Sequence, residues 1–331
     1  MDRDIERKLI TILKIIADAD EPLGARVISR KLDEEGIHLT ERAVRFHLQL
    51  MDEKKLTRAV GRQNRAGREI TEKGREELTN ALVSDKVGMV SSRMDELSYQ
   101  TDFNLDTRQG RIILNVSMIS KDDFAEAMCI AAEAFESNMC IGRLVLTANE
   151  GQRLGNITVP KGMKALGTVC TVTINGILLH HRIPVKSKFG GILQMKDYQP
   201  LRFIEIIEYN ASSLDPAEIF IKGKMTSVLN VARTGSGKVL AGFREIPTAC
   251  LTEAEAIFKR LEKIGLSGTI VIGEPNQPTL QIPVANGYVG LVILAGLNPL
   301  AAVEEAGIST QNMSMYTMVD FQELTTLPLA Y

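Results

Sequence analysis

The 331-residue chain contains no tryptophan, and aromatic residues make up only 5% of it. Its four histidines and four cysteines show no CxxC, HExxH or mixed Cys/His ligand spacing, so the sequence predicts no metal site. The cysteines, Cys129, Cys140, Cys170 and Cys250, stand in apolar stretches, and we expect free thiols in a reducing compartment. The chain has no uncharged apolar run of about 18 residues, so we expect no transmembrane helix.

Neither sign of charge dominates the composition. Lys and Arg total 39 against 41 Asp and Glu, which gives a net charge of −2, and the composition is typical of a soluble globular protein. The first ten residues, MDRDIERKLI, are charged throughout and do not resemble a signal peptide. We therefore expect a cytoplasmic protein, with no membrane partner and with enough length for two or three domains.

The stretch TGSGKVL, Thr234–Leu240, resembles the start of a phosphate-binding loop. Such a loop also needs a glycine five residues before Gly237 and a Ser or Thr after the lysine. Ala232 and Val239 occupy these two positions, so both requirements fail. The sequence therefore predicts no nucleotide cofactor, and the glycines of this stretch need another explanation.

Residues 1–80 have the pattern of a winged helix-turn-helix. Three amphipathic helices are indicated by apolar residues at three- and four-residue steps, and the third begins at Thr40, a good N-cap. Two short strands, Leu56–Val60 and Glu69–Thr71, flank a turn rich in Gly and Arg. Six basic residues and no acidic residue fall in the fifteen positions 54–68.

This layout favours binding to double-stranded operator DNA. The pattern places Arg42, Arg45 and His47 on the outer face of the third helix, which would enter the major groove, while the basic turn would hold phosphates. The predicted DNA-contacting residues are Thr40, Glu41, Arg42, Arg45, Phe46, Arg62, Arg65 and Arg68. The alternatives are a merely solvated charged surface and a winged helix that binds protein.

The remainder of the chain reads as an internal repeat. TRQGRIILNVSMI (Thr107–Ile119) matches TGSGKVLAGFREI (Thr234–Ile246), and four further pairs of strings match in the same order at offsets of 123 to 127 residues. The matches pair Asn175 with Asn298, two residues that we expect to hold turn geometry. In this reading TGSGKVL is the turn that opens the first strand of the second copy.

The predicted fold class is therefore α+β and multidomain: an N-terminal winged helix-turn-helix followed by an internally duplicated α/β regulatory domain with pseudo-twofold repeats. A cleft between such copies is a usual place for a small molecule. The segment 209–233 is expected to be helical from Asp215 onward. The predicted ranges are 1–80 for the winged helix, 81–106 for a connecting helix and linker, 107–208 for repeat 1, 209–233 for the inter-repeat helices, and 234–326 for repeat 2.

Four strings resemble the regulatory domain of the archaeal NrpR nitrogen-regulatory repressors: DPAEIFIKGKMTSV, TGSGKVLAGFREIP, IPVKSKFGGILQ and GLNPLAAVEEAGI. The order of a winged helix followed by this domain is also similar. The resemblance implies a repressor of nitrogen-fixation and ammonium-assimilation genes that binds operator DNA as an oligomer and is released by 2-oxoglutarate. It further implies that a companion protein without a winged helix joins the complex, because this chain has one regulatory domain.

A dicarboxylate effector needs cationic or backbone N–H partners. The segment His180–Gly191 offers three cations, whereas the matched segment of the second copy, EEAGISTQNMS, has none. The predicted effector-binding residues are Arg182, Lys186, Ser187, Lys188 and Gly190. Solvated loop charges are the alternative.

The remaining alternative function is a metabolic enzyme with a fused autoregulatory winged helix. The sequence shows no Ser-His-Asp order, nucleophile elbow or metal spacing, so we expect a regulator and predict no catalytic residues.

Overall fold

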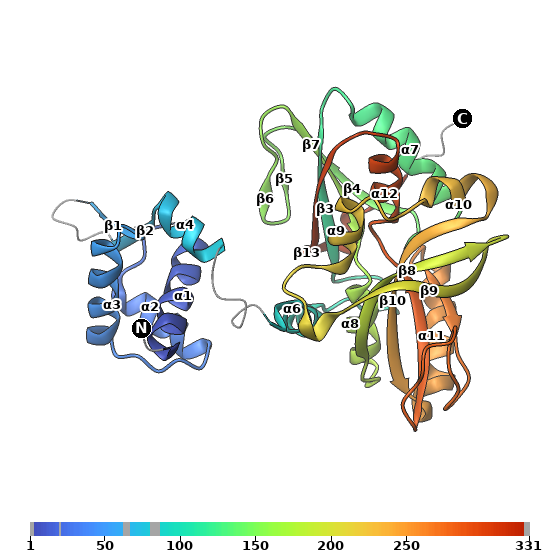
Figure 1. The fold of residues 1–331 in the computed structure, drawn as a ribbon, viewed down its shortest axis with the longest axis horizontal. Coiled ribbons are helices and arrows are strands. Elements are labelled where there is room, and N and C mark those ends of the chain that lie inside the picture. The colour runs from blue at the N-terminus through green and yellow to red at the C-terminus, as the bar shows by residue number, and fades with distance from the viewer. Residues whose placement is uncertain (1–2, 20, 62–66, 80–86, 328–331) are drawn as a thin grey trace. The chain divides into compact units, whose positions relative to one another are not determined.

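The computed structural model describes residues 3–19, 21–61, 67–79 and 87–327. The chain forms two compact units, Met1–Lys86 and Val87–Tyr331, and each is described by itself (Figure 1). The predicted residues Arg62 and Arg65 lie outside the described residues, as do positions 80–86 of the predicted connecting segment.

The first unit has the element order of a winged helix. Its elements are α1 (Arg3–Ala17), α2 (Ala25–Glu34), α3 (Glu41–Glu53), β1 (Thr57–Val60), β2 (Gly67–Ile70) and α4 (Glu72–Thr79). β1 and β2 pair antiparallel, and the backbone of Leu23 bridges to Arg68 on the β2 side. The helices pack around one apolar core because their buried side chains recur at helical spacing. That core includes Leu9, Ile12, Leu13, Ile28, Leu32, Val44, Leu48 and Met51.

The second unit is a mixed helix and sheet structure, and its first half follows a helix, α6 (Met89–Gln100). The elements of that half are β3 (Arg111–Ser120), α7 (Phe124–Glu136), β4 (Leu144–Ala148), β5 (Arg153–Leu154), β6 (Ile157–Thr158), β7 (Met163–Val169), α8 (Val172–His180), β8 (Lys186–Lys196), β9 (Gln199–Glu208) and the 3-10 turn η2 (Tyr209–Ala211).

The second half begins with two short helices. Its elements are α9 (Pro216–Lys222), α10 (Val228–Thr234), β10 (Gly237–Pro247), η3 (Thr248–Cys250), α11 (Leu251–Lys263), β11 (Thr269–Ile272), β12 (Tyr288–Leu294), α12 (Asn298–Glu305), β13 (Thr310–Asp320), η4 (Phe321–Glu323) and β14 (Thr325–Thr326). The sequence pattern predicts one helical segment from Asp215, and the structure divides it. Gly223 ends α9, and the next residue, Lys224, has a left-handed backbone with φ 51°.

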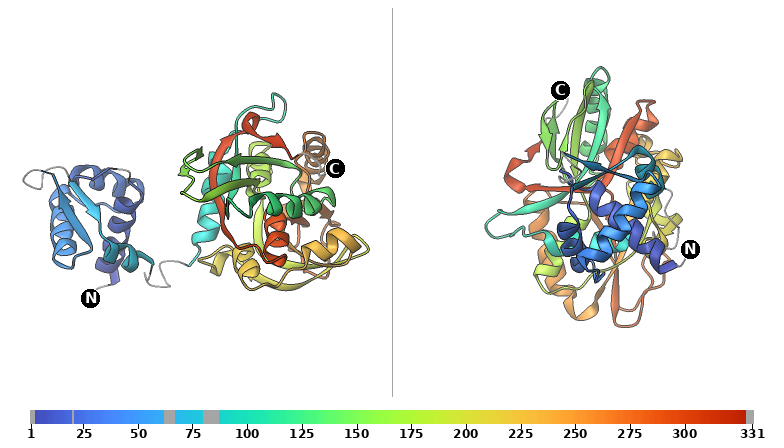
Figure 2. Two further views of the ribbon diagram at one scale, coloured as in Figure 1. Left: turned by 90° about the horizontal axis from the view of Figure 1, so that it is seen from above. Right: turned by 90° about the vertical axis from the view of Figure 1, so that its left-hand side faces the viewer.

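The strands build two five-stranded antiparallel sheets, in the orders β13-β3-β7-β4-β14 and β11-β12-β10-β8-β9 (Figures 1 and 2). In both halves a strand, a helix, two strands of the large sheet, a helix and a strand follow one another, and the first half adds the separate β5-β6 pair and β9. The last of these strands pairs with the sheet of the other half: β8 pairs with β10, and β13 pairs with β3. The two halves are therefore interlocked through an exchange of one strand each.

Two apolar clusters fill the space between sheets and helices. One includes α7 and α12 side chains such as Ala131, Phe135 and Leu300 together with Val239 and Leu240 of β10. The other joins α8 and α11 to both sheets, with Ile177, Phe258 and Leu291 among its members. The exchange of strands explains why each cluster draws residues from both halves.

The stretch TGSGKVL links the end of α10 to the start of β10. Gly235 caps α10 with a left-handed backbone, and Gly237 opens the strand at φ 151°. A phosphate-binding loop leads from a strand into a helix N-terminus, where free N–H groups meet the phosphate. This loop runs in the opposite sense, so its glycines serve the turn, as the sequence predicts.

Candidate functional site

Helix α3 presents a basic and aromatic outer face. Thr40 caps the helix, and its hydroxyl accepts a hydrogen bond of 3.3 Å from the backbone N–H of Ala43. Arg42 and Arg45 are exposed one turn apart, and the Phe46 side chain beside them is 65% exposed. Glu41 forms an ion pair with Arg45 within the helix. An exposed helix face of this chemistry suits the major groove of DNA.

His47 does not share that face, contrary to the expectation from the sequence. Its residue is only 8% exposed and belongs to the buried stripe of α3 with Val44, Leu48 and Met51. Burial and the nearby Lys8 lower the pKa of His47, so the ring is neutral at pH 7. Position 47 is one step of 100° beyond Phe46 around the helix, and this step turns the His47 side chain inward.

Two arginines in the strands of the wing form ion pairs within the first unit. The Arg68 guanidinium Nε lies 2.9 Å from a carboxylate oxygen of Asp52, and both side chains are only 26% exposed. Arg58 pairs with Glu69 at 3.0 Å. The basic run in positions 54–68 contains no acid, but its acidic partners stand just outside it. Arg68 therefore fastens the wing to the end of α3, whereas the sequence predicts a phosphate contact.

The cations of the predicted effector segment are dispersed. Arg182 is exposed and has a left-handed backbone with φ 61°. The Lys186 Nζ lies 3.9 Å from the ring centroid of Tyr288, and the Lys188 Nζ lies 3.9 Å from a carboxylate oxygen of Glu245. Of the predicted residues, only Gly190 lines the pocket described next, and Ser187 contacts Asn175 beside it.

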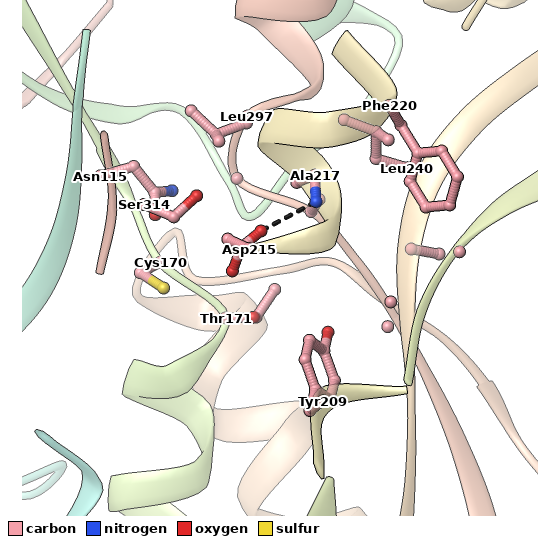
Figure 3. Close-up of a pocket in the computed structure, with 16 residues that line it drawn as sticks. Asn115, Cys170, Thr171, Tyr209, Asp215, Ala217, Phe220, Leu240, Leu297 and Ser314 are labelled. Atoms are coloured by element: carbon pink, nitrogen blue, oxygen red, sulfur yellow. Dashed lines mark hydrogen bonds between the residues drawn. The ribbon is translucent and has the colours of Figure 1, made fainter. Parts of the chain in front are cut away.

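A pocket of about 40 Å³ lies between the two sheets, where the N-terminal ends of α8 and α12 meet α9 (Figure 3). This volume would hold about three water molecules, so a larger ligand would have to widen the pocket. Both halves contribute to the lining, which includes Asn115, Cys170, Thr171, Gly190, Tyr209, Asp215, Gly242, Gly296 and Ser314. The N-terminal ends of helices carry partial positive charge, so the site favours an anion.

Directly beside this pocket is a fully buried arginine, Arg244 of β10. Its Nε donates to the Asn175 Oδ1 at 2.7 Å, and one Nη donates to the Thr171 hydroxyl at 2.7 Å. The other Nη has no hydrogen-bond partner among the described residues. A Cβ added to Gly242 would stand 2.7 Å from that nitrogen, so the glycine leaves the guanidinium room at the pocket lining.

Burial lowers the pKa of Arg244, since water is withdrawn from the charge. A buried guanidinium without a full set of acceptors is costly, and such groups concentrate at functional sites. Ser187 joins the network, because its hydroxyl accepts a hydrogen bond of 3.0 Å from the Asn175 amide. An anion that entered the pocket would supply the acceptor that Arg244 lacks.

Asp215 provides an acid in the same pocket. One carboxylate oxygen accepts a hydrogen bond of 2.8 Å from the Ala217 N–H and so caps α9 (Figure 3). Burial raises the pKa of Asp215 to about 6. Burial also raises the pKa of Tyr209, whose ring lines the pocket, so its hydroxyl stays protonated. The pocket therefore combines one fixed cation with one acid that titrates close to neutrality.

The two halves approach closely at this point. A Cβ on Gly296, just before α12, would stand 1.9 Å from the carbonyl oxygen of Val169 on β7. No side chain fits there, so the glycine permits the contact. Across the described ranges, no cluster of three or more His, Cys, Asp or Glu side chains could hold a metal ion. No described helix combines the length and the apolar character that a membrane crossing requires.

Sequence reasoning missed Arg244. The one available signal was a charged pair, Arg244 and Glu245, inside the otherwise apolar strand VLAGFREIP. A charge within a buried strand calls for a specific partner.

Comparison with known proteins identifies both units. Residues 87–326 match the family model of the NrpR regulatory domains NRD1 and 2, and residues 10–78 match that of the ribonuclease R winged-helix domain. The global nitrogen regulator NrpRI of Methanosarcina mazei is 38% identical over 98% of this chain and 99% of its own length. The global nitrogen regulator NrpR of Methanocaldococcus jannaschii is 33% identical over 98% of this chain, which spans 56% of that relative.

A solved structure is also similar. The crystal structure of a nitrogen repressor-like protein from Methanococcus jannaschii aligns with 72% of this chain and 98% of its own, at a TM-score of 0.62 and 29% sequence identity. The family model covers more than half of the chain, and the Methanosarcina relative matches almost from end to end. The chain therefore belongs to the NrpR family of nitrogen regulators.

Proposed function

We propose that the chain is a transcriptional repressor that binds operator DNA through its winged helix and leaves it when a small dicarboxylate, 2-oxoglutarate, enters the pocket between the two sheets. The genes concerned would be those of nitrogen fixation and ammonium assimilation. The observation that carries the proposal is the pairing, in one chain, of an exposed Arg42–Arg45–Phe46 face with a buried, incompletely paired Arg244. This combination fits a ligand-responsive regulator better than an enzyme.

The effector site proposed here is centred on Arg244. A dicarboxylate offers two charged acceptor groups, and one of them would meet the free Nη of Arg244. The N-terminal ends of α8 and α12 would face the other. Ser187 and Gly190 would contribute from beside Arg244, whereas Arg182, Lys186 and Lys188 would act from the outer side of the site.

We further propose that the regulatory domain arose by duplication and has a pseudo-twofold arrangement. The repeated element order and the reciprocal exchange of β8 and β13 support this idea. The pocket would lie at the centre of the pair, because equivalent helix N-termini meet there. Asn175 and Asn298 do not act as a matched pair, however. Asn298 binds both backbone groups of Leu240, and in the first half Thr173 does the same to Ile113.

The partners that follow are operator DNA, a second copy of the chain and a companion protein without a winged helix. A twofold repressor reads two half-sites, which raises affinity for a unit whose net charge is small. A gel shift with operator DNA, with and without 2-oxoglutarate, tests the proposal. We expect a shifted band that the effector abolishes, with the effector recovered unchanged. Absence of operator binding, or consumption of 2-oxoglutarate, would refute it.

A further inference from the structure

Strand β9 extends one sheet beyond the pattern that the two halves share. β8 pairs with β10 as β13 pairs with β3, but β9 adds a strand on the outer side of β8 (Figure 1). Among the described strands none lies beyond β13 in the other sheet, and none pairs with the outer side of β9. β9 is therefore an open edge, ten residues long, that neither the DNA-binding face nor the pocket explains.

This edge is unusually apolar for a surface that meets only water. Leu201 is 45% exposed, Ile204 is 36% exposed and Ile206 is 50% exposed. Proteins usually protect open edges with charge or proline, because an apolar edge can pair with another strand. β9 has one proline, Pro200, near its start, and three charged residues, Arg202, Glu205 and Glu208, beside its exposed apolar side chains. An exposed apolar group of this kind indicates an interaction surface.

The register of β9 determines how two copies of it would match. Ile192 of β8 pairs with Glu205 and Leu193 pairs with Phe203, so Ile204 is an extra, bulged residue. Gln194 pairs with Arg202 and Met195 pairs with Pro200, so Leu201 is bulged as well. Glu205, Phe203 and Arg202 therefore pair with three consecutive residues of β8. When the bulged residues are left out, Arg202 and Glu205 come directly before and after Phe203 along the strand.

We propose that β9 pairs antiparallel with β9 of a second copy about a twofold axis at Phe203. In this register each Arg202 stands opposite a Glu205 of the other copy, and each Ile206 stands opposite a Pro200. A twofold axis perpendicular to a sheet requires that residues opposite each other point to the same face of the sheet. Because Leu201 and Ile204 are bulged, this holds for Arg202 opposite Glu205 and for Ile206 opposite Pro200. The two protomers would form one continuous ten-stranded sheet.

The exposed charges of β9 suit pairing with a second copy of the strand. Arg202 and Glu205 are both exposed, and no described residue pairs with the Glu205 carboxylate. The Arg202 Nε donates to Gln194 at 3.1 Å, which orients the guanidinium and leaves its Nη groups for a carboxylate. Opposite charges that face each other across strands stabilise the pair, and like charges destabilise it. The inference rests on the proposed homo-oligomeric repressor and names the surface that would join its copies.

Charge reversal tests the register. The mass of the full-length chain would be followed by analytical ultracentrifugation over a concentration series, without DNA. We expect the parent to be dimeric or larger at tens of micromolar. Arg202→Glu and Glu205→Arg should each raise the dimer dissociation constant at least tenfold, and the Arg202→Glu/Glu205→Arg double variant should return it to within about threefold of the parent.

Two further variants provide a second test of the interface and a control. Ile206→Asp places an acid in the apolar part of the edge and should also dissociate the dimer, whereas Lys259→Glu on the exposed side of α11 should not. A monomeric parent, or single variants that remain dimeric, would overturn the proposal. Dissociation by both singles without rescue in the double variant would overturn it as well. Because no DNA is present, a failure here is distinct from a failure of operator binding.

Discussion

The amide oxygen of Asn175 on α8 accepts a hydrogen bond of 2.7 Å from Nε of Arg244 on β10, while its amide nitrogen donates to Ser187 on β8 at 3.0 Å. This one side chain links a helix and a strand of the first half to the first strand of the second half. The direction of the Arg244 guanidinium therefore depends on both halves. An anion that binds Arg244 would act on the same three elements, which offers a physical route from the pocket to the rest of the unit.

The first prediction concerns Arg244 itself. In Arg244→Met an apolar chain of similar length fills the buried space, so the fold should be retained. The loss of a charge-assisted hydrogen bond should lower the affinity for 2-oxoglutarate about ten- to a hundredfold. The variant should bind operator DNA like the parent and resist release by the effector in a gel-shift titration. Arg182→Met, which removes an exposed cation, is the matched control and should respond normally. Release of the Arg244 variant at the parent's effector concentration would show that the pocket is not the effector site.

The two asparagines should behave differently. Asn175→Ala leaves the Arg244 Nε without its acceptor, so effector affinity should fall together with stability. Asn298→Ala removes two hydrogen bonds to the Leu240 backbone, at 2.8 and 3.0 Å, and should lower stability only. Each loss of a buried partner costs about 1–3 kcal/mol of unfolding free energy. Chemical denaturation and effector calorimetry on both variants separate the two roles. Equal effector affinity in both variants would contradict the positioning role of Asn175.

The DNA-binding prediction uses the outer face of α3. Arg45→Ala should cost about 1–3 kcal/mol of operator binding and relax sequence preference if the side chain meets a guanine edge. Arg65→Ala should weaken binding to all DNA sequences alike and reduce the dependence of that binding on salt concentration. Arg68→Ala should instead lower the unfolding free energy of the first unit, because Arg68 is paired with Asp52. Binding constants across operator and random DNA at several salt concentrations distinguish these outcomes. If the Arg45 variant binds operator DNA like the parent, the prediction that α3 contacts the DNA is wrong.

The first unit was predictable because its signals are local. Apolar spacing of three and four residues determines which helix faces are buried, and the misplacement of His47 is a matter of a single residue in the phase of α3. The pocket was not predictable in this way. Arg244 meets Thr171 and Asn175 from positions about seventy residues earlier, and Asp215 comes from a third segment.

A count of cations along the chain instead favours the segment with Arg182, Lys186 and Lys188, three residues that are exposed. Sequence proximity measures how many charges a segment has. It does not show whether those charges are buried, and burial is what would make Arg244 a strong anion partner.

The last prediction concerns pH, because Asp215 lines the same pocket with a pKa of about 6. Above pH 6 its carboxylate is ionised and repels a dianion, and below pH 6 it is protonated. Binding of a dianion should therefore take up a proton, so affinity should rise as pH falls from 7.5 to 5.5, by up to about tenfold per unit above pH 6. The charged or titratable neighbours of Asp215 are Glu218, Arg244, Tyr209 and Cys170. Asp215→Asn keeps an acceptor for the Ala217 N–H and cannot ionise, so its affinity should be high and nearly independent of pH. Calorimetry of 2-oxoglutarate binding at four pH values checks both proteins, with circular dichroism as the control for folding. If the affinity of the parent for 2-oxoglutarate stays constant or falls on acidification, the prediction that Asp215 lies beside the bound effector is wrong.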